Sequence, residues 1–316
     1  MSSRPSANYV IVPRQRLRLS SMPIRISILF LLLCCLGPKH VYAQDAKSPK
    51  LRNNKKQAEP SLDFGYWSQG KTRFFASTRM ELGAPYLRPA VAFGYGKPHW
   101  IWTGVDFNAI TTVEFAQAYG GVRVATPVLD ISAGFRDTAS YNKTFYSPQQ
   151  QYTRSDVYDT PGARARYWAF EFEAVGIVPL PHAALVADFI FIHSVDVPSN
   201  RVFYDESYRA LVADSTYFVF RFAALARLLN QDSLRVGVLA EHVFGTARPE
   251  GVWRIGPVLS FQLTEHLEIA SALTMAVASP DSLGFVLGAY GVAGLRYRWA
   301  TGESNPKLPW RGEMLP

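Results

Sequence analysis

The strongest constraint on the fold is an alternating pattern near the C-terminal end of the chain, from residue 283 to residue 299 (LGFVLGAYGVAGLRYRW). Leu295 and Trp299 fall on one parity of this segment, and Arg296 and Arg298 fall on the other. Successive side chains of a strand point to opposite faces, so this period of two predicts a strand with one apolar and one polar face. In water, an apolar face of this length invites aggregation unless it is covered.

A lipid bilayer would cover that face, with the apolar residues toward lipid and the arginines toward an enclosed interior. The same alternation recurs along the chain before residue 283, which predicts an all-β fold: a closed antiparallel transmembrane β-barrel of about 12 strands, within a range of 10–14. The other alternating segments are 74–83, 87–94, 101–108, 113–120, 129–136, 167–173, 185–192, 217–223, 234–241, 253–262 and 267–275.

The connections between these segments alternate in length. One set is tight, and the other set includes two long segments, 137–163 and 194–214, rich in Tyr, Ser, Asp and Pro. Both long segments fall on the side opposite the two termini. Short turns at one end and long loops at the other are typical of outer-membrane barrels.

A secreted β-sandwich is the soluble alternative, because it also alternates between a buried and a solvated face. Three features favour the barrel instead. The apolar face is dense in Phe, Trp and Leu, the other face is rich in Gly and Ala with isolated charges, and the strands run to about ten residues.

The N-terminal region has the parts of a secretory signal peptide at residues 22–43, with Arg25 before an apolar run and a small-residue site ending at Ala43. That apolar run is shorter than a membrane-spanning helix needs. We expect cleavage after Ala43. Because Met22 begins a more ordinary signal, we expect residues 1–21 to be an extension that is not translated.

Cleavage would remove both cysteines, Cys34 and Cys35. A disulfide, a thiolate metal site and a cysteine nucleophile are therefore excluded for the mature chain. Cleavage also removes much of the positive charge, because residues 1–43 hold six Lys and Arg and no acidic residue, whereas the whole chain has a formal net charge of +8.

The rest of the positive charge lies in a leader at residues 44–71, which lacks periodicity and is predicted to be cationic and disordered. Its first part, 44–60, holds five basic and two acidic residues, which leaves 22 basic and 23 acidic residues in 61–316. A near-neutral folded part gives no basic footprint for nucleic acid. The segments 44–60 and 300–316 are instead candidates for contacts with other envelope proteins.

The signal peptide, the amphipathic strands over residues 72–299 and the aromatic end of the last strand together resemble the bacterial outer-membrane β-barrel proteins as a class. The resemblance implies the outer membrane of a Gram-negative cell, with outer-membrane lipid and the barrel-assembly machinery as partners. One departure is the tail 300–316, because the assembly signal normally ends the chain. The residues that match this signal are Gly294, Leu295, Tyr297 and Trp299.

Charged side chains on the inward parity are the candidate functional residues. Opposed rows of acids and bases can set up a transverse field in a narrow, porin-like pore for small polar solutes. The same charges can instead pair and brace a sealed barrel that acts as an envelope scaffold. The sequence leaves both readings open for Arg79, Glu81, Arg88, Glu114, Glu171, Glu173, Asp188, Arg221, Arg235, Glu241, Arg254, Glu268, Arg296 and Arg298.

An outer-membrane lipid hydrolase is the third interpretation. Such enzymes, which this chain resembles in architecture, carry a His and a Ser two positions apart on one strand, so that the imidazole can deprotonate the hydroxyl. The nearest pair here is His193 and Ser194, whose adjacent side chains point to opposite faces. No metalloprotease, nucleophile-elbow or phosphate-loop motif is present. We therefore expect no catalytic residues, no metal and no cofactor.

Overall fold

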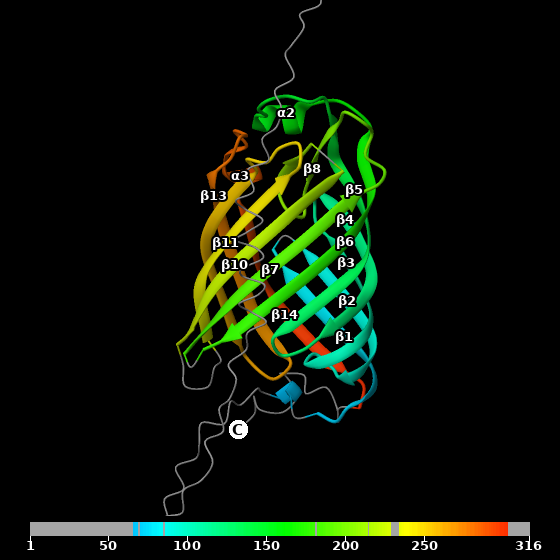
Figure 1. Ribbon diagram of the computed structural model, residues 1–316, viewed down its shortest axis with the longest axis vertical. Coiled ribbons are helices and arrows are strands. Elements are labelled where there is room, and N and C mark those ends of the chain that lie inside the picture. Colours follow the sequence, from blue (N-terminus) through cyan, green and yellow to red (C-terminus); the bar gives the residue numbers. More distant parts are fainter. Residues whose placement is uncertain are drawn as a thin grey trace, which may run out of the picture. The chain divides into compact units, whose positions relative to one another are not determined.

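The computed structural model describes residues 66–68, 70–84, 86–180, 182–213, 215–228 and 234–302. Twelve of its strands form one ring in which every neighbour is antiparallel, and β1 pairs with β14 to close the ring. The predicted closed antiparallel barrel of about 12 strands is therefore confirmed (Figure 1).

Each barrel strand has 11 to 18 residues. They are β1 (Arg73–Gly83), β2 (Leu87–Lys97), β3 (Ile101–Thr111), β4 (Phe115–Ala125), β5 (Leu129–Tyr146), β6 (Arg164–Pro179), β7 (Ala183–Ser194), β10 (Thr216–Arg227), β11 (Leu234–Gly245), β12 (Val252–Gln262), β13 (Leu267–Ala278) and β14 (Tyr290–Ala300).

The outer surface of the barrel is apolar. Phe93, Phe107 and Phe135 are 50%, 51% and 62% exposed, whereas charged neighbours on the other parity, such as Glu81 and Asp106, are buried. A soluble sheet would place its aromatic face inward and its charged face outward. This inverted arrangement is that of a barrel whose solvent is lipid.

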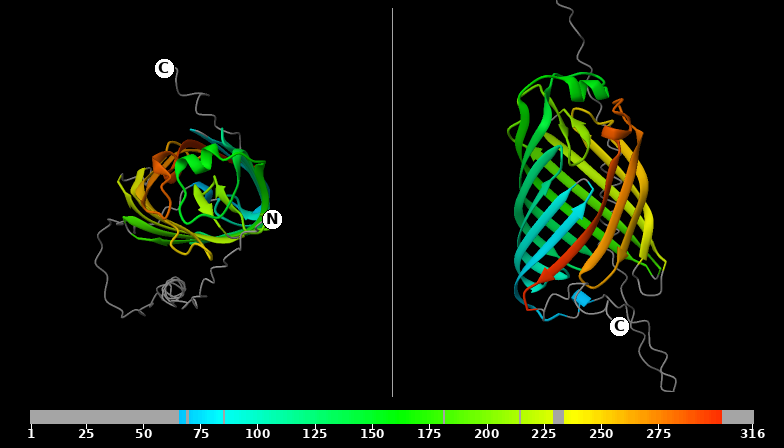
Figure 2. Two further views of the ribbon diagram at one scale, coloured as in Figure 1. Left: turned by 90° about the horizontal axis from the view of Figure 1, so that it is seen from above. Right: turned by 180° about the vertical axis from the view of Figure 1, so that it is seen from behind.

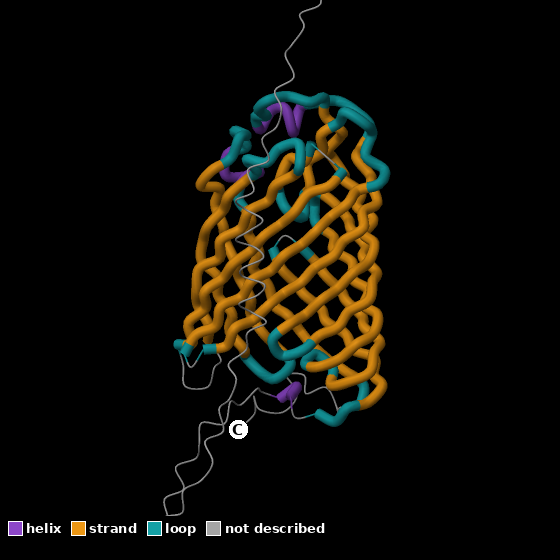
Figure 3. Tube along the Cα trace, in the orientation of Figure 1, coloured by secondary structure: helices purple, strands orange, loops and turns teal. Residues whose placement is uncertain are grey.

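The two ends of the barrel differ. The end that carries the beginning of β1 and the end of β14 has short turns, and we call it the terminal end; Arg73 there donates to the carbonyl of Thr301 at 2.7 Å. The opposite end, which we call the loop end, carries the longer connections (Figure 3). They include the helices α2 (Arg154–Asp159) and α3 (Gly284–Gly288) and the strands β8 (Val202–Asp205) and β9 (Ala210–Val212).

The pair β8–β9 is a hairpin that turns into the barrel instead of extending away from it (Figure 2). All seven of its strand residues are buried. Its outer edge continues the sheet, since Phe203 pairs with Phe145 at the far end of β5. The hairpin therefore narrows the lumen at the loop end.

The last strand is shorter than the alternation predicts. It begins at Tyr290, and Gly284–Gly288 form a helix instead of strand. Gly284 adopts a positive φ of 66°, which breaks the extended chain, and Leu287 becomes fully buried beside the hairpin. Burial of Leu287 and Leu283 under the loops prevails over the local pattern of alternation.

Other boundaries also differ from the prediction. The long connection predicted at 137–163 is reduced to 147–163, because β5 continues to Tyr146 with Thr138 and Ser140 buried on the inward side. Val113 is 79% exposed in the turn before β4, not part of that strand.

The terminal segments lie largely outside the described residues, including 1–21, the signal 22–43, the region 44–60 and the end of the tail. Within the predicted leader 44–71, however, Tyr66–Ser68 form a 3₁₀ turn, η1, and Trp67 is buried against the barrel. The prediction of disorder is wrong for this turn. No helix in the described part of the chain is long and apolar enough to cross a membrane.

Candidate functional site in the barrel interior

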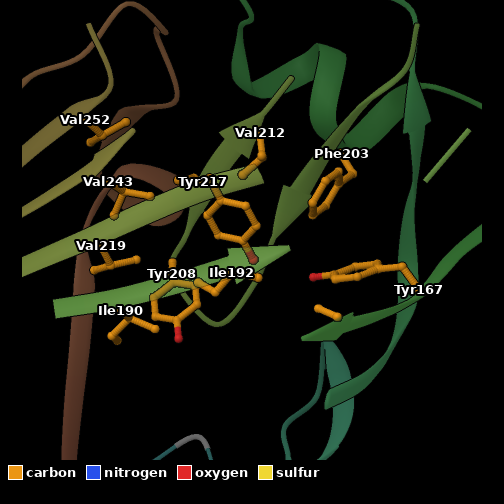
Figure 4. Packing of buried hydrophobic residues seen from close by; sticks show 12 residues of the cluster. Tyr167, Ile190, Ile192, Phe203, Tyr208, Val212, Tyr217, Val219, Val243 and Val252 are labelled. Atoms are coloured by element: carbon orange, nitrogen blue, oxygen red, sulfur yellow. The ribbon is translucent and has the colours of Figure 1, made fainter. Parts of the chain in front are cut away.

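The hairpin packs on apolar side chains that point into the lumen. We call this group the wall-side cluster; in it, Phe203, Tyr208 and Val212 of the hairpin region meet inward residues of β6, β7, β10, β11 and β12 (Figure 4). Its buried members are Tyr167, Ala169, Ile190, Ile192, Phe203, Tyr208, Ala210, Val212, Tyr217, Val219, Val243 and Val252.

The other face of the hairpin is covered by the loops. There Tyr204 and Leu211 pack with Leu287 of α3 and Val157 of α2, and the Tyr204 hydroxyl donates to the Leu287 carbonyl at 2.9 Å. The short helix α2 is held by a capping box between Thr153 and Asp156. The hairpin is therefore enclosed between the barrel wall and the loops.

Arg254 of β12 ties the hairpin to the wall. It is 1% exposed, and its Nε donates to the carbonyl of Gly288 at 2.6 Å. Its two terminal nitrogens donate to the carbonyls of Tyr208 and Arg209 at 3.0 and 2.6 Å. One guanidinium thus satisfies three backbone acceptors, from the hairpin turn and from the end of α3.

Asp205 makes a second anchor, to residues of β5, β6 and β10. Its carboxylate accepts from Arg136 at 2.9 Å and from the hydroxyl of Tyr167 at 3.0 Å, and it also accepts from Tyr217. Arg136 reaches Glu171 at 3.0 Å as well. Arg136 and Asp205 are fully buried, where an ion pair is favourable only if further hydrogen bonds complete it, as they do here.

The predicted inward charges form two rows along neighbouring strands. In the first row, Asp188, Arg221, Glu241 and Arg254 lie directly opposite one another on β7, β10, β11 and β12. The Arg221–Asp188 distance is 3.4 Å, and Glu241 lies 2.7 Å from Arg221 and 2.6 Å from Arg254.

The second row crosses the closing seam of the barrel. Arg296 of β14 lies 2.8 Å from Glu81 of β1 and 3.3 Å from Glu268 of β13. Arg298 reaches Glu268 at 2.5 Å, and Arg79 lies 3.4 Å from Glu81.

The remaining predicted charges are dispersed. Glu171 lies 3.0 Å from Arg136 of the neighbouring β5, and Glu173 lies 3.8 Å from Arg123 of β4. Glu114 lies in a loop-end turn 3.7 Å from Arg209. Arg88 lies inside with a buried Nε that has no hydrogen-bond partner among the described residues. Arg235 is exposed on the inward parity near the terminal end.

Several interior charges are missing from the sequence-based set. Arg123 lies 3.4 to 3.8 Å from Asp106, Asp130 and Glu173, and Arg136 reaches Asp205. Alternation already placed Asp130 and Arg136 on the inward parity. For β4 the predicted faces were wrong, because the prediction turned Glu114 inward, whereas the structure buries Phe115 and Tyr119 inside the barrel and so brings Arg123 inward. Asp205 could not be placed in this way, because it lies in a loop that folds back into the lumen.

Two cavities lie in the described interior, and Arg123 of the first lies 3.8 Å from Glu173 of the second. The larger cavity, about 320 Å³, lies toward the terminal end and is lined by His99, Trp100 and Arg79, among others. The smaller cavity, about 160 Å³, lies below the hairpin turn beside Glu206 and Arg209.

The candidate His–Ser pair is not a dyad. His193 pairs with Phe170 on the outward parity and bonds the Thr216 hydroxyl at 2.8 Å, whereas Ser194 is buried on the inward parity. In the part of the chain that the structure describes, no group of three or more His, Cys, Asp or Glu side chains is arranged to hold a metal ion.

The proposed assembly residues lie on β14 next to β1. Leu295 is 43% exposed on the outer surface, Tyr297 and Trp299 share its parity, and Gly294 pairs inward with Gly83. This placement puts the aromatic end of the chain's last strand at the closing seam.

Comparisons with known proteins give only loose likenesses. No protein-family model and no curated protein matches the chain. Among solved structures, the KdgM porin aligns with 71% of this chain and 98% of its own, at 7% identity and a TM-score of 0.37. The β domain of the Bordetella autotransporter BrkA covers 72% and 98%, at 12% identity and 0.36. A loop-deleted OmpT, an outer-membrane protein of Vibrio cholerae, covers 72% and 99%, at 10% identity and 0.30.

TM-scores this low carry no argument about function. The assignment of this chain to the outer-membrane type of barrel rests on its own strand pairing, its apolar outer surface and its charged interior.

Glu206, in the hairpin turn, is a buried carboxylate whose two oxygens have no hydrogen-bond partners among the described residues. It is 4% exposed. Burial raises the pKa of Glu206 to about 7, an effect that the nearby Asp205 adds to and that Ser140 and Lys143 only partly oppose. Below this pH the hairpin carries a neutral carboxyl group.

This shift predicts a pH-dependent stability. In the unfolded chain Glu206 ionises near 4.5, so its favourable contribution is complete below that pH and is lost as the pH rises through about 7. The Glu206→Gln variant has no ionisable carboxyl group at this position, so its unfolding free energy does not change with pH in this way. Between about pH 5 and about pH 8, we expect wild type to lose up to about 3 kcal/mol of unfolding free energy relative to the variant. Unfolding in detergent micelles measures the difference, and the exposed Glu250→Gln change is the control. A constant difference across this pH range contradicts the assignment.

Proposed function

We propose that the chain is an integral outer-membrane β-barrel whose lumen is sealed at the loop end by its own β8–β9 hairpin, and that it acts as a scaffold of the cell envelope. In this proposal the loop end faces the cell exterior and the terminal end faces the periplasm, as short turns do in barrels of this type.

The observation that carries this proposal is the burial of the hairpin. Its two strands are buried throughout, and Arg254 and Asp205 fix it to different strands of the barrel wall. A loop that rests loosely at the mouth would instead expose polar residues to water. A barrel that is closed at the loop end does not conduct solutes through its lumen. The paired interior charges then stabilise the barrel and do not select a solute.

Location and assembly are part of the same proposal. Cleavage after Ala43 would deliver the chain to the periplasm, and the outward residues of β14 would then present the assembly signal. Envelope partners would bind through 44–60 and 300–316, most of which lies outside the described residues. The separation of His193 and Ser194 supports a protein without enzymatic activity.

A narrow pore for small polar solutes is the second candidate, and one observation favours it. Acidic Glu171 and Glu173 face basic Arg88 and Arg221 across the smaller cavity. Such a transverse field selects small polar solutes where a continuous path exists. The buried hairpin at the loop end argues against a continuous path.

Liposome swelling distinguishes the two candidates. Protein refolded from residues 44–316 is inserted into vesicles, and its folded state is checked by its heat-sensitive gel mobility. We expect swelling in small amino acids or sugars no faster than in vesicles without protein. Faster swelling that is altered by Arg88→Ala, a change on the wall of the smaller cavity, would instead establish the pore and reject the sealed barrel.

A further inference from the structure

The larger cavity has the size and the access that a ligand-binding site requires. Its volume of about 320 Å³ lies at the low end of the range for small-molecule pockets. The short turns at His99–Trp100 and Thr126–Pro127 form its rim, so a ligand enters from the terminal end. The sealing of the loop end does not affect this access.

Three guanidinium groups line this cavity with few hydrogen bonds. Among the described residues, the ion pair of Arg79 is with Glu81, at 3.4 Å, and Glu81 has a closer partner in Arg296 at 2.8 Å. Arg298 donates to Glu268 at 2.5 Å. The Nε atoms of Arg79 and Arg123 are buried without a hydrogen-bond partner in the described structure.

Loose ion pairs of this kind leave donors free for an anion. Arg123 lies 3.4 Å from Asp106 and 3.6 Å from Asp130, beyond the usual length of a charge-assisted hydrogen bond. A carboxylate can take up two parallel donors from one guanidinium, which gives it geometric selectivity. Arg79, with a single long contact, is the best placed to bind one.

The cavity also offers a free acceptor. Asp106 is 7% exposed, and its Oδ1 has no hydrogen-bond partner among the described residues. The small residues Ala90 and Ala92 of β2 lie between β1 and β3 on the same face, opposite Arg79 and Asp106 respectively. All four residues line the same cavity, and the two alanines take up little of its space.

Apolar side chains complete the enclosure. Trp100, Trp102, Val175 and Ile177 line the same cavity. Burial lowers the pKa of His99 to about 4, so this histidine is neutral near pH 7 and adds no charge. The cavity therefore combines basic side chains, the carboxylates of Asp106 and Asp130, and an apolar wall.

We infer that this cavity binds a small zwitterion of the α-amino acid class. The ligand carboxylate lies against Arg79, its ammonium group donates to Asp106, and an apolar side chain packs toward Trp100 and Trp102. A buried donor or acceptor left without a partner is costly, so a ligand that supplies both groups is favoured over one that supplies one.

A calorimetric titration tests the site with three matched probes. Leucine carries both charges, 4-methylpentanoate lacks the ammonium group, and 3-methylbutylamine lacks the carboxylate. For refolded residues 44–316 in micelles, with protein-free micelles subtracted, we expect leucine to bind at least about tenfold more tightly than either analogue.

Variants assign the two ends of the ligand. Arg79→Gln is expected to weaken leucine binding about tenfold or more and to abolish its advantage over the amine. Asp106→Asn is expected to abolish its advantage over 4-methylpentanoate. Arg235→Gln, an inward arginine that does not line the cavity, is the control and should leave binding unchanged.

Two results would overturn the inference. One is equal binding of all three probes, which would mark apolar adsorption; the other is no binding of leucine by protein whose folding has been verified. Because binding is measured without transport, failure of the sealed-barrel proposal would leave this result unaffected.

Discussion

Replacing Arg254 by methionine is expected to release the β8–β9 hairpin while leaving the barrel ring intact. The change removes three hydrogen bonds to the carbonyls of Tyr208, Arg209 and Gly288, and one ion pair to Glu241. Breaking a buried ion pair typically costs about 3–5 kcal/mol, because the remaining charge and acceptors stay buried without partners. Glu241 keeps its contact with Arg221 at 2.7 Å, which limits the loss.

Limited trypsin digestion measures the release. Arg209 lies half-buried in the hairpin turn and its Nη1 donates to the Val286 carbonyl at 2.8 Å, so we expect cleavage after this residue to rise sharply in the Arg254→Met variant. The unfolding free energy should fall by about 3 kcal/mol or more. The matched control is Arg235→Met on the neighbouring strand, whose exposed side chain predicts a change within about 0.5 kcal/mol. Equal digestion of both variants contradicts the anchoring role of Arg254.

Removing the hairpin altogether is expected to open the barrel. The variant replaces residues 200–213 by a short Gly-Ser linker. None of the ring pairings from β1 to β14 involves β8 or β9, so the wall should still close. The lumen would lose Phe203, Tyr208 and Val212 from the wall-side cluster, and water would reach its remaining apolar members.

Permeation follows from this loss of packing. We expect vesicles that contain the hairpin-deleted variant to swell many times faster in small sugars than vesicles that contain wild type. A control variant carries the same linker in place of residues 198–200 only, which are exposed and precede the hairpin. It should behave like wild type. Slow swelling of a folded deletion variant would mean that the hairpin is not the seal.

The wall of the barrel was predictable because its physical demand is local. Each spanning strand needs an apolar face toward lipid, and because of this requirement apolar and polar residues alternate along its sequence. Twelve strands, their antiparallel order and the short turns of the terminal end followed from that period. The rows of paired charges followed as well, since Arg221, Glu241 and Arg254 keep strict inward parity.

The inward position of the β8–β9 hairpin was not predictable, because the residues that hold it are distant in sequence. A period of two cannot show that Asp205 contacts Arg136, or that Leu287 turns away from the strand to cover Tyr204. One signal was present nonetheless. Ile190 and Ile192 interrupt the polar parity of β7, and the structure shows that they are inward residues packed against the hairpin.

The proposed binding cavity could not be predicted from the sequence, for a related reason. Arg79 is identifiable as an inward charge, but its single long contact to Glu81 depends on Arg296 being the closer partner. Which charge is left without a partner is decided by distances of a few tenths of an ångström. Alternation predicts the face of the sheet on which a side chain lies, but it does not predict which of several charged partners that side chain binds.

Single-channel recording in a planar bilayer tests the central claim most directly, with wild type and the hairpin-deleted variant compared under the same conditions. The sealed-barrel account predicts a wild-type protein that inserts and stays silent, and a variant that shows discrete, stable openings. Discrete openings of the wild-type protein, equal in size to those of the variant, would contradict it.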